Sequence, residues 1–360
     1  MFETFTFSYL HFRRPPSSAP LPSLPKGITR HFVNTPSGKI EVLANSPSSP
    51  SPNATPIFFV HGGMGGAWVW LEYLGFLAGQ QIPAYAVSMR GHGNSWHPSY
   101  LRMVFFTTKH MLATDAVAAA NWVSSRHGNK PVVYVGHSSG GGLGQYILSS
   151  QMLKVKGLVL AAAVPGFGSL PVYINWWRLD PWFNIRMIFH GYHPNSPLSH
   201  PALTRRIFFS DAYPEGDLLR FQSRTNRYES FLWPFGMMTS FVKPANLLSQ
   251  ITPSSSSSGA PSSSSKILVL AGGIDAIMTP KVMKELASMY RIAFAGLVKQ
   301  KKMDRDEGDD EVRTVKGEGG EDTEGQGVRL CFVPGAGHHL QNDVTWEIGA
   351  KKLVEFYRQL

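Results

Sequence analysis

The chain has 360 residues, of which 43% are apolar, and its formal net charge is +10 at pH 7. This length and apolar content suffice for one large domain with a lid or for two small domains, and they exclude a globally disordered chain. No apolar run approaches the roughly 20 residues of a membrane-spanning helix, and no aromatic-basic pattern of a nucleic-acid-binding protein stands out. The single cysteine, Cys331, excludes an internal disulfide.

The positive charge is unevenly distributed along the chain. Residues 301–327 hold ten acidic and five basic residues, so the rest of the chain carries a net charge of about +15. A basic surface of this kind attracts anionic lipid or an acidic substrate, or is simply solvated. Peripheral contact with an anionic membrane therefore stays open, as does the oligomeric state, and we expect no nucleic-acid partner.

Residues 1–28 precede the first predicted strand, and we expect them to be disordered. Residues 1–25 lack the apolar core of a secretory signal, so we expect an intracellular, cytoplasmic protein. An organellar presequence stays open as the alternative.

Short apolar runs follow, each with a turn and a helical stretch behind it. A hairpin comes first, with strands at 30–34 and 39–44. Continuous apolarity is typical of strands covered on both faces, as in a parallel sheet between two layers of helices. A helix is predicted to begin at Thr279 and Pro280. The continuous runs lie at 57–60, 84–88, 132–135, 158–163, 266–271 and 328–333.

Three segments interrupt this pattern and set the expected domain boundaries. Residues 165–250 are rich in aromatic residues and arginine and lie between two predicted strands, as an inserted cap or lid would. The serine-rich linker 251–265 and the acidic stretch 301–327 are typical of flexible surface segments without chemistry. The core is then expected at 29–164, 266–300 and 328–360.

A serine between glycines follows the third continuous run. Residues 136–140 read Gly-His-Ser-Ser-Gly, and a strand that runs into Gly-x-Ser-x-Gly and then into a helix is the setting of a nucleophile elbow. Such a tight turn admits no side chain on either flank, and it exposes the serine hydroxyl. Ser138 is therefore the candidate nucleophile; an ordinary turn residue is the alternative.

A serine nucleophile needs a general base and a group that orients the base. Asp275 lies in the loop after the run 266–271, and His338 lies in the loop after the run 328–333. Loops at the carboxyl ends of parallel strands meet at one edge of the sheet. These positions predict a triad of Ser138, Asp275 and His338. The alternatives are a turn-capping role for Asp275 and His339 as the base.

The glycine-rich loop after the first continuous run predicts an oxyanion hole. Its residues 61–66 read His-Gly-Gly-Met-Gly-Gly, and backbone N–H groups in such a loop can stabilise a developing negative charge. The Ser139 N–H would be one donor and the N–H of Gly63 or Met64 the other. A phosphate-binding loop is disfavoured because no Lys-Ser/Thr pair follows. No residue cluster has metal-ligand spacing, so we expect no metal and no cofactor.

With these motifs the sequence resembles the α/β-hydrolase superfamily from about residue 29 to residue 360, and in particular its esterase-like and lipase-like serine hydrolases. The resemblance implies an α/β fold with a mostly parallel eight-stranded sheet, helices on both faces, and a helical cap inserted after the sixth strand. It rests on the loop 61–63, the motif from Arg90 to Ser95, the elbow at 136–140, and the loops that hold Asp275 and His338.

The expected function is cofactor-independent cleavage of an ester or related acyl substrate through an acyl-enzyme intermediate. Thioesterases, C–C bond hydrolases and acyltransferases would use the same triad, because fold and triad do not fix the substrate. A non-catalytic binding protein on the same scaffold is the remaining alternative. The aromatic residues of 165–250 predict an apolar small-molecule substrate in contact with Trp176, Trp177 or Trp182.

Overall fold

The computed structural model describes residues 21–51, 53–226, 228–252, 266–303, 311–316 and 321–360. Most of the expected N-terminal disordered segment and nearly all of the serine-rich linker therefore lie outside the described residues.

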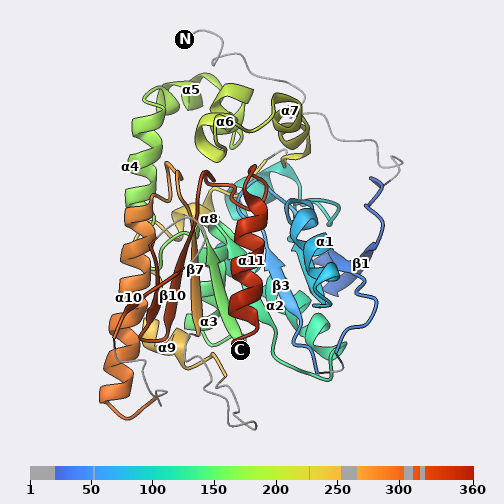
Figure 1. Ribbon diagram of the computed structural model, residues 1–360. Helices are drawn as coiled ribbons and strands as arrows, with labels where there is room; N and C mark the ends of the chain where they lie inside the picture. Colours follow the sequence, from blue (N-terminus) through green and yellow to red (C-terminus); the bar gives the residue numbers. More distant parts are fainter. Residues whose placement is uncertain (1–20, 52, 227, 253–265, 304–310, 317–320) are drawn as a thin grey trace.

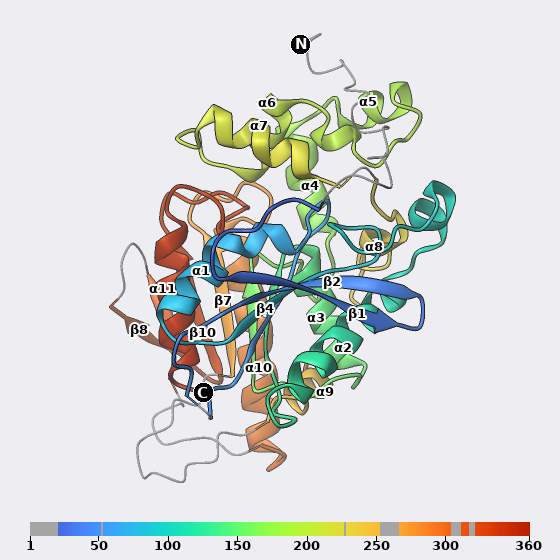
Figure 2. The ribbon, with the colours of Figure 1, turned by 90° about the vertical axis from the view of Figure 1, so that its right-hand side faces the viewer.

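A ten-stranded sheet in the order β1-β2-β4-β3-β5-β6-β7-β10-β9-β8 forms the centre of the molecule (Figures 1 and 2). The six strands from β4 to β10 in that order are parallel, and the two strands at each edge run antiparallel. The strands are β1 Ile28–Thr35, β2 Gly38–Asn45, β3 Ile57–Val60, β4 Ala84–Ser88, β5 Val133–His137, β6 Gly157–Ala161, β7 Ile267–Gly272, β8 Arg313–Val315, β9 Asp322–Gly325 and β10 Val328–Val333.

The parallel strands are buried at every position except Tyr85 of β4, as their unbroken apolar runs predict. All residues of β3 and of β10 are buried, without the alternation of a half-exposed strand. Each of the eight predicted strands lies within two residues of an observed one. The mostly parallel sheet with helices on both faces is thereby confirmed.

Helices cover both faces of the sheet. On one face α1 packs against α11, and on the other α2, α3, α9 and α10 pack in sequence. Helix α10 begins at Pro280, where the Thr279 hydroxyl accepts a hydrogen bond from the Val282 N–H, as predicted. No helix of the described chain combines the length and the apolarity that crossing a bilayer requires. These helices are α1 Leu71–Gly79, α2 Lys109–Ser125, α3 Ser139–Ser149, α9 Pro244–Leu248, α10 Pro280–Lys299 and α11 Trp346–Tyr357.

Residues 165–250, here called the cap segment, join β6 to β7 and follow the sixth strand, as the resemblance implies. Helices α5, α6 and α7 lie above one end of the sheet (Figure 1). The segment is hydrogen-bonded to the core at several points, for example from the Phe231 N–H to the Val104 carbonyl. Besides α9, its elements are α4 Leu170–Leu179, α5 Phe183–Phe189, η5 Ser196–Leu198, α6 Pro201–Phe208, α7 Glu215–Arg224 and α8 Leu232–Phe235.

The acidic stretch 301–327 differs from the expected flexible insertion, because it contributes β8 and β9 to the edge of the sheet beside β10. The Asp322 carboxylate is buried and accepts hydrogen bonds from the Phe332 N–H at 2.9 Å and from the Lys352 ammonium at 2.5 Å. This buried ion pair ties β9 to α11. With β8 and β9, the described residues form a sheet of ten strands, two more than the resemblance implies. The parts 304–310 and 317–320 lie outside the described residues.

Candidate active site

Ser138 lies in the sharp turn between β5 and α3. Its φ of 52° and ψ of −122° form a conformation that costs a non-glycine residue about 1–3 kcal/mol. A Cβ atom on Gly136 would collide with the backbone of Gly140, and one on Gly140 would collide with the His61 carbonyl. Glycine is therefore required on both flanks, and the turn holds the serine at the carboxyl edge of the sheet.

Three loops bring the three predicted triad residues together. His338 Nε2 lies 3.0 Å from Ser138 Oγ, and His338 Nδ1 lies 2.9 Å from Asp275 Oδ2. The other Asp275 oxygen accepts hydrogen bonds from the backbone N–H groups of Ile277 and Met278, both at 2.9 Å. Because an ionised carboxylate only accepts, the proton of the neutral imidazole is on Nδ1 and the Nε2 lone pair faces the serine hydroxyl.

The neighbouring histidines occupy other positions. His339 Nδ1 lies 2.8 Å from Asn342 Oδ1, and burial and the nearby His338 lower the pKa of His339 to about 3. His137 Nε2 donates to the His338 carbonyl at 2.9 Å, and burial holds the pKa of His137 well below its usual range. Both rings are therefore neutral at pH 7, and His338 is the imidazole that contacts Ser138.

Other reactive groups are separate from this cluster. Cys331 is buried in β10, and its burial raises the pKa of the thiol to about 12, which suppresses the nucleophilic thiolate. Within the ranges that the structure describes, no three His, Cys, Asp or Glu side chains are grouped so as to hold a metal ion.

The two candidate donors in the glycine-rich loop differ in their contacts. The Met64 N–H donates to Glu229 Oε2 at 2.8 Å and is therefore occupied. Among the described residues, the Gly63 N–H and the Ser139 N–H have no hydrogen-bond acceptor. Gly63 and Ser139 also line the same cavity as Ser138. These contacts favour Gly63 over Met64, a choice that the sequence leaves open.

A cavity of about 220 Å³ lies beside Ser138 and His338. Most of its wall is apolar, which suits an apolar substrate group. The cap segment supplies most of this wall, through Val172, Tyr173, Trp176, Phe183, Met187, Pro194, Pro197, Leu198, Phe208, Phe231, Trp233, Pro234 and Met237.

The three predicted tryptophans do not share one position. Trp176 lines the cavity, whereas Trp177 is 53% exposed and Trp182 is 40% exposed, and neither lines it. Tyr173 and Trp176 are three residues apart in α4 and so face the same side, whereas Trp177 is turned by about 100° from Trp176. Of the three, only Trp176 therefore lies where a group in this cavity would touch it, and its contact with substrate stays a prediction.

Several residues of the cavity wall are not among the residues predicted from the sequence. Phe183 and Met187 are four residues apart on α5, and this helical spacing is the signal that would have found them. Glu229 also lines the cavity and lies in no recognisable motif. Its partner His92 lies in the motif after β4, but the sequence does not indicate the pairing.

The chain matches the family model of the alpha/beta hydrolase fold over residues 55–301. This match spans more than half of the chain, and the fold agrees with it, so the protein belongs to the α/β-hydrolase family. No significant relative was found among curated protein sequences.

Solved structures of similar fold include several named hydrolases. A thermophilic esterase from Thermogutta terrifontis has a TM-score of 0.60 at 15% identity, covering 92% of this chain and 98% of that one. The carboxylesterase CesB from Bacillus subtilis has a TM-score of 0.55 at 17% identity, covering 92% of each chain. The 2-hydroxy-6-oxo-6-phenylhexa-2,4-dienoate hydrolase from Rhodococcus sp. strain RHA1 has a TM-score of 0.53 at 14% identity, covering 92% and 99%. At these identities the likeness concerns the fold.

Proposed function

We propose that the protein is a cofactor-independent serine hydrolase that cleaves an ester of an apolar acyl group. The hydrogen-bonded sequence Asp275–His338–Ser138 at the wall of an apolar cavity carries this proposal. The names of the solved neighbours, which include an esterase and a carboxylesterase, agree with it.

In the acylation step, Ser138 Oγ attacks the carbonyl carbon of the ester and its proton passes to His338 Nε2. The carbonyl π electrons move to the oxygen, and the N–H groups of Gly63 and Ser139 stabilise the negative charge that forms there. Asp275 stabilises the imidazolium through its hydrogen bond to Nδ1. Collapse of the intermediate breaks the ester C–O bond, and the leaving alcohol takes the proton from His338.

In the deacylation step, His338 removes a proton from a water molecule as that water attacks the acyl carbon. The second tetrahedral intermediate uses the same two N–H donors. Its collapse breaks the bond to Ser138 Oγ, which regains a proton from His338, and the carboxylic acid leaves. The triad, the two backbone donors and water therefore account for every bond and proton in the two steps.

The same triad would serve a thioester, a C–C bond or an acyl transfer to an alcohol. The apolar wall favours an apolar acyl group without choosing among these bonds. A panel of p-nitrophenyl esters, acyl thioesters and vinylogous diketones, assayed with the same preparation, separates these classes by kcat/KM. We expect the esters to give the highest values.

Replacing Ser138 tests the proposal. Ser138→Ala should fold normally and lose turnover by about 10⁴-fold or more, as expected when a triad nucleophile is removed. Ser125→Ala, on the exposed face of α2, is the matched control and should retain full activity. Turnover by Ser138→Ala at the wild-type rate would contradict the proposal.

A further inference from the structure

The cap segment holds the proposed oxyanion loop from both sides of Met64. The Met64 N–H donates to Glu229 Oε2 at 2.8 Å, and the Met64 carbonyl accepts from the Asn226 N–H at 2.8 Å. Met64 has a φ of 63°, a left-handed conformation that is uncommon for a residue with a side chain. The two contacts therefore fix a strained residue, and with it the loop that presents the neighbouring Gly63 N–H.

Glu229 is paired with a buried histidine. Its Oε2 lies 2.8 Å from His92 Nε2, and His92 Nδ1 lies 2.9 Å from the Arg90 carbonyl. A carbonyl only accepts, and so does an ionised carboxylate, so pairing with an ionised Glu229 requires a proton on both ring nitrogens of His92, which makes the ring an imidazolium. The Glu229 side chain is 8% exposed and that of His92 is fully buried, so the structure places a shielded ion pair beside the cavity.

The surroundings of His92 support its positive charge. Burial opposes that charge, but the Glu229 carboxylate and the hydrogen bonds leave the pKa of His92 above its ordinary value. Asp115 adds a further attraction, whereas His61, whose ring centre lies 4.6 Å away, is neutral because burial holds its pKa well below the usual range. Trp233 packs edge-on to the His92 ring.

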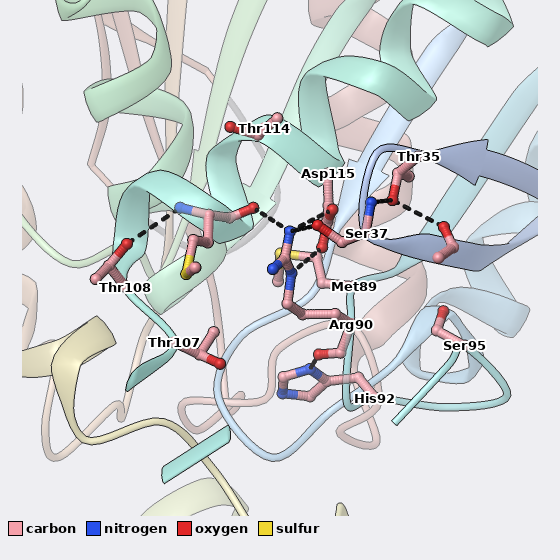
Figure 3. A network of polar contacts seen from close by, with 12 residues as sticks. Thr35, Ser37, Met89, Arg90, His92, Ser95, Thr107, Thr108, Thr114 and Asp115 are labelled. Carbon is pink, nitrogen blue, oxygen red and sulfur yellow. Dashed lines mark hydrogen bonds and ion pairs between the residues drawn. The ribbon is translucent and has the colours of Figure 1, made fainter. Parts of the chain in front are cut away.

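The other end of this polar network is fixed to the core. The Arg90 guanidinium forms two hydrogen bonds with the Asp115 carboxylate, at 2.6 and 2.8 Å, and further ones with Ser37 and the Met111 carbonyl (Figure 3). Arg90 is thereby immobilised, and its own carbonyl is the acceptor for His92 (Figure 3). A continuous set of contacts thus runs from Asp115 on α2 to the loop at Met64.

The charge of Glu229 matters because of where it lies. Glu229 and Gly63 line the same cavity, and an ideal Cβ on Gly63 would be 3.8 Å from Glu229 Oε2. A carboxylate so close to a developing oxyanion would oppose it unless a positive charge offsets the carboxylate. His92, whose Nε2 lies 2.8 Å from Glu229 Oε2, supplies that charge.

We propose that Glu229 and His92 are positioning residues for the oxyanion hole. Glu229 holds the Met64 peptide so that the Gly63 N–H points into the cavity, and the His92 imidazolium offsets the carboxylate that does so. This inference rests on the proposed serine hydrolase function. Neither side chain bonds to the substrate, and no proton leaves either residue during the reaction.

Substitution of both residues tests the proposal with p-nitrophenyl butyrate. Removing one oxyanion donor costs about 10²–10³-fold in kcat, so a misplaced donor should cost part of this. In Glu229→Gln, which keeps an acceptor for the Met64 N–H, we expect kcat to fall by about 10-fold. In Glu229→Ala, which removes that acceptor, we expect a fall of about 100-fold. The KM of both variants should stay within about threefold of wild type. Asp180→Asn, which removes a buried ion pair with Arg186 inside the cap segment, is the control and should retain kcat.

His92 variants separate positioning from a merely structural role. His92→Gln leaves the Glu229 carboxylate without a cation, so its loss in kcat relative to wild type should exceed that of Glu229→Gln. This loss should shrink at alkaline pH, where wild-type His92, whose pKa lies above its ordinary value, also gives up its proton. The double variant Glu229→Gln/His92→Gln should recover the kcat of Glu229→Gln. Equal losses at all pH values with no recovery in the double variant would overturn the role of His92.

Affinity for a trifluoromethyl ketone, which forms a tetrahedral oxyanion on the serine, provides the second readout. Both Glu229 variants should weaken this inhibitor by about the same factor as kcat. If the Glu229 variants bind the ketone as tightly as wild type but have a lower melting temperature, the proposal is overturned in favour of a structural role. If only their KM for the ester rises, it is overturned in favour of a substrate contact. If wild type itself neither hydrolyses the ester nor binds the ketone, the proposed function fails instead.

Discussion

The substitution Asp275→Asn should disable the proposed base by changing its tautomer. Asp275 Oδ1 accepts two backbone N–H groups, from Ile277 and Met278, and Oδ2 faces His338 Nδ1. In an asparagine, the two backbone donors require the amide oxygen at the Oδ1 position, so the NH₂ group would face His338. Nδ1 must then accept and Nε2 must carry the proton, and an Nε2–H cannot take the proton of Ser138.

The magnitude follows from this loss of the base. Forcing the wrong tautomer of a triad histidine lowers kcat by about 10⁴-fold, which corresponds to about 5.4 kcal/mol in the activation free energy. Initial rates with p-nitrophenyl butyrate between neutral and alkaline pH measure it, and circular dichroism shows whether the variant is folded. A folded Asp275→Asn protein with activity within about tenfold of wild type would contradict the role of Asp275 in fixing the tautomer, because the amide would then be orienting the imidazole correctly.

Three further outcomes are expected. Trp176→Ala should change the acyl-chain preference along p-nitrophenyl esters from acetate to dodecanoate. The change in kcat/KM should be about fourfold per carbon, since each buried methylene is worth about 0.8 kcal/mol. Trp177→Ala, at an exposed position, should leave the preference unchanged, and equal profiles in the two variants would contradict a place for Trp176 in the wall of the acyl site. Lys352→Met should lower the free energy of unfolding, measured in urea, by about 3–5 kcal/mol, because it leaves the buried Asp322 carboxylate unpaired. The double variant Lys352→Met/Asp322→Asn should recover part of that loss. A loss below about 1 kcal/mol in Lys352→Met would contradict a stabilising role of the ion pair. The free energy of unfolding should fall by up to about 1.4 kcal/mol per pH unit as the pH drops from 6.5 towards 3. The reason is that His339 binds a proton near pH 6.5 in the unfolded chain but only near pH 3 in the folded protein. Urea titrations should give a shallower pH dependence for His339→Asn than for wild type, and identical slopes would argue against a neutral His339.

The strands, and the meeting of Ser138, Asp275 and His338, could be predicted from the sequence because each depends on local pattern. Unbroken apolar runs such as 57–60 and 328–333 indicate strands buried on both faces, and those strands are found at these residues. Ser138, Asp275 and His338 each follow such a run directly. The parallel arrangement of the strands then brings the three loops to one edge of the sheet.

Contacts made across the cap segment could not be predicted in this way. Met64 and Glu229 are 165 residues apart, and their hydrogen bond exists only because the cap segment folds back onto the glycine-rich loop. Which loop N–H is free therefore depends on tertiary structure. The roles of Trp176 and Trp177 likewise depend on how α4 is rotated about its axis, which a list of aromatic residues does not reveal.

In the acidic stretch 301–327, average composition does not predict the observed structure. A segment dominated by charged residues and glycine is usually solvated, but one carboxylate, Asp322, has a buried cation as its partner in Lys352. That partner lies in the C-terminal helix α11, outside the segment. The composition of the segment alone therefore does not predict the two strands β8 and β9.

The most direct test of the proposed function is to map the site of reaction with a fluorophosphonate. This reagent phosphonylates an activated serine, and digestion followed by mass spectrometry identifies the modified residue. We expect a single adduct on Ser138, stoichiometric with loss of esterase activity, and none in Ser138→Ala or after unfolding in urea. An adduct on Ser139 or on another serine, or full activity in a protein labelled at Ser138, would contradict it.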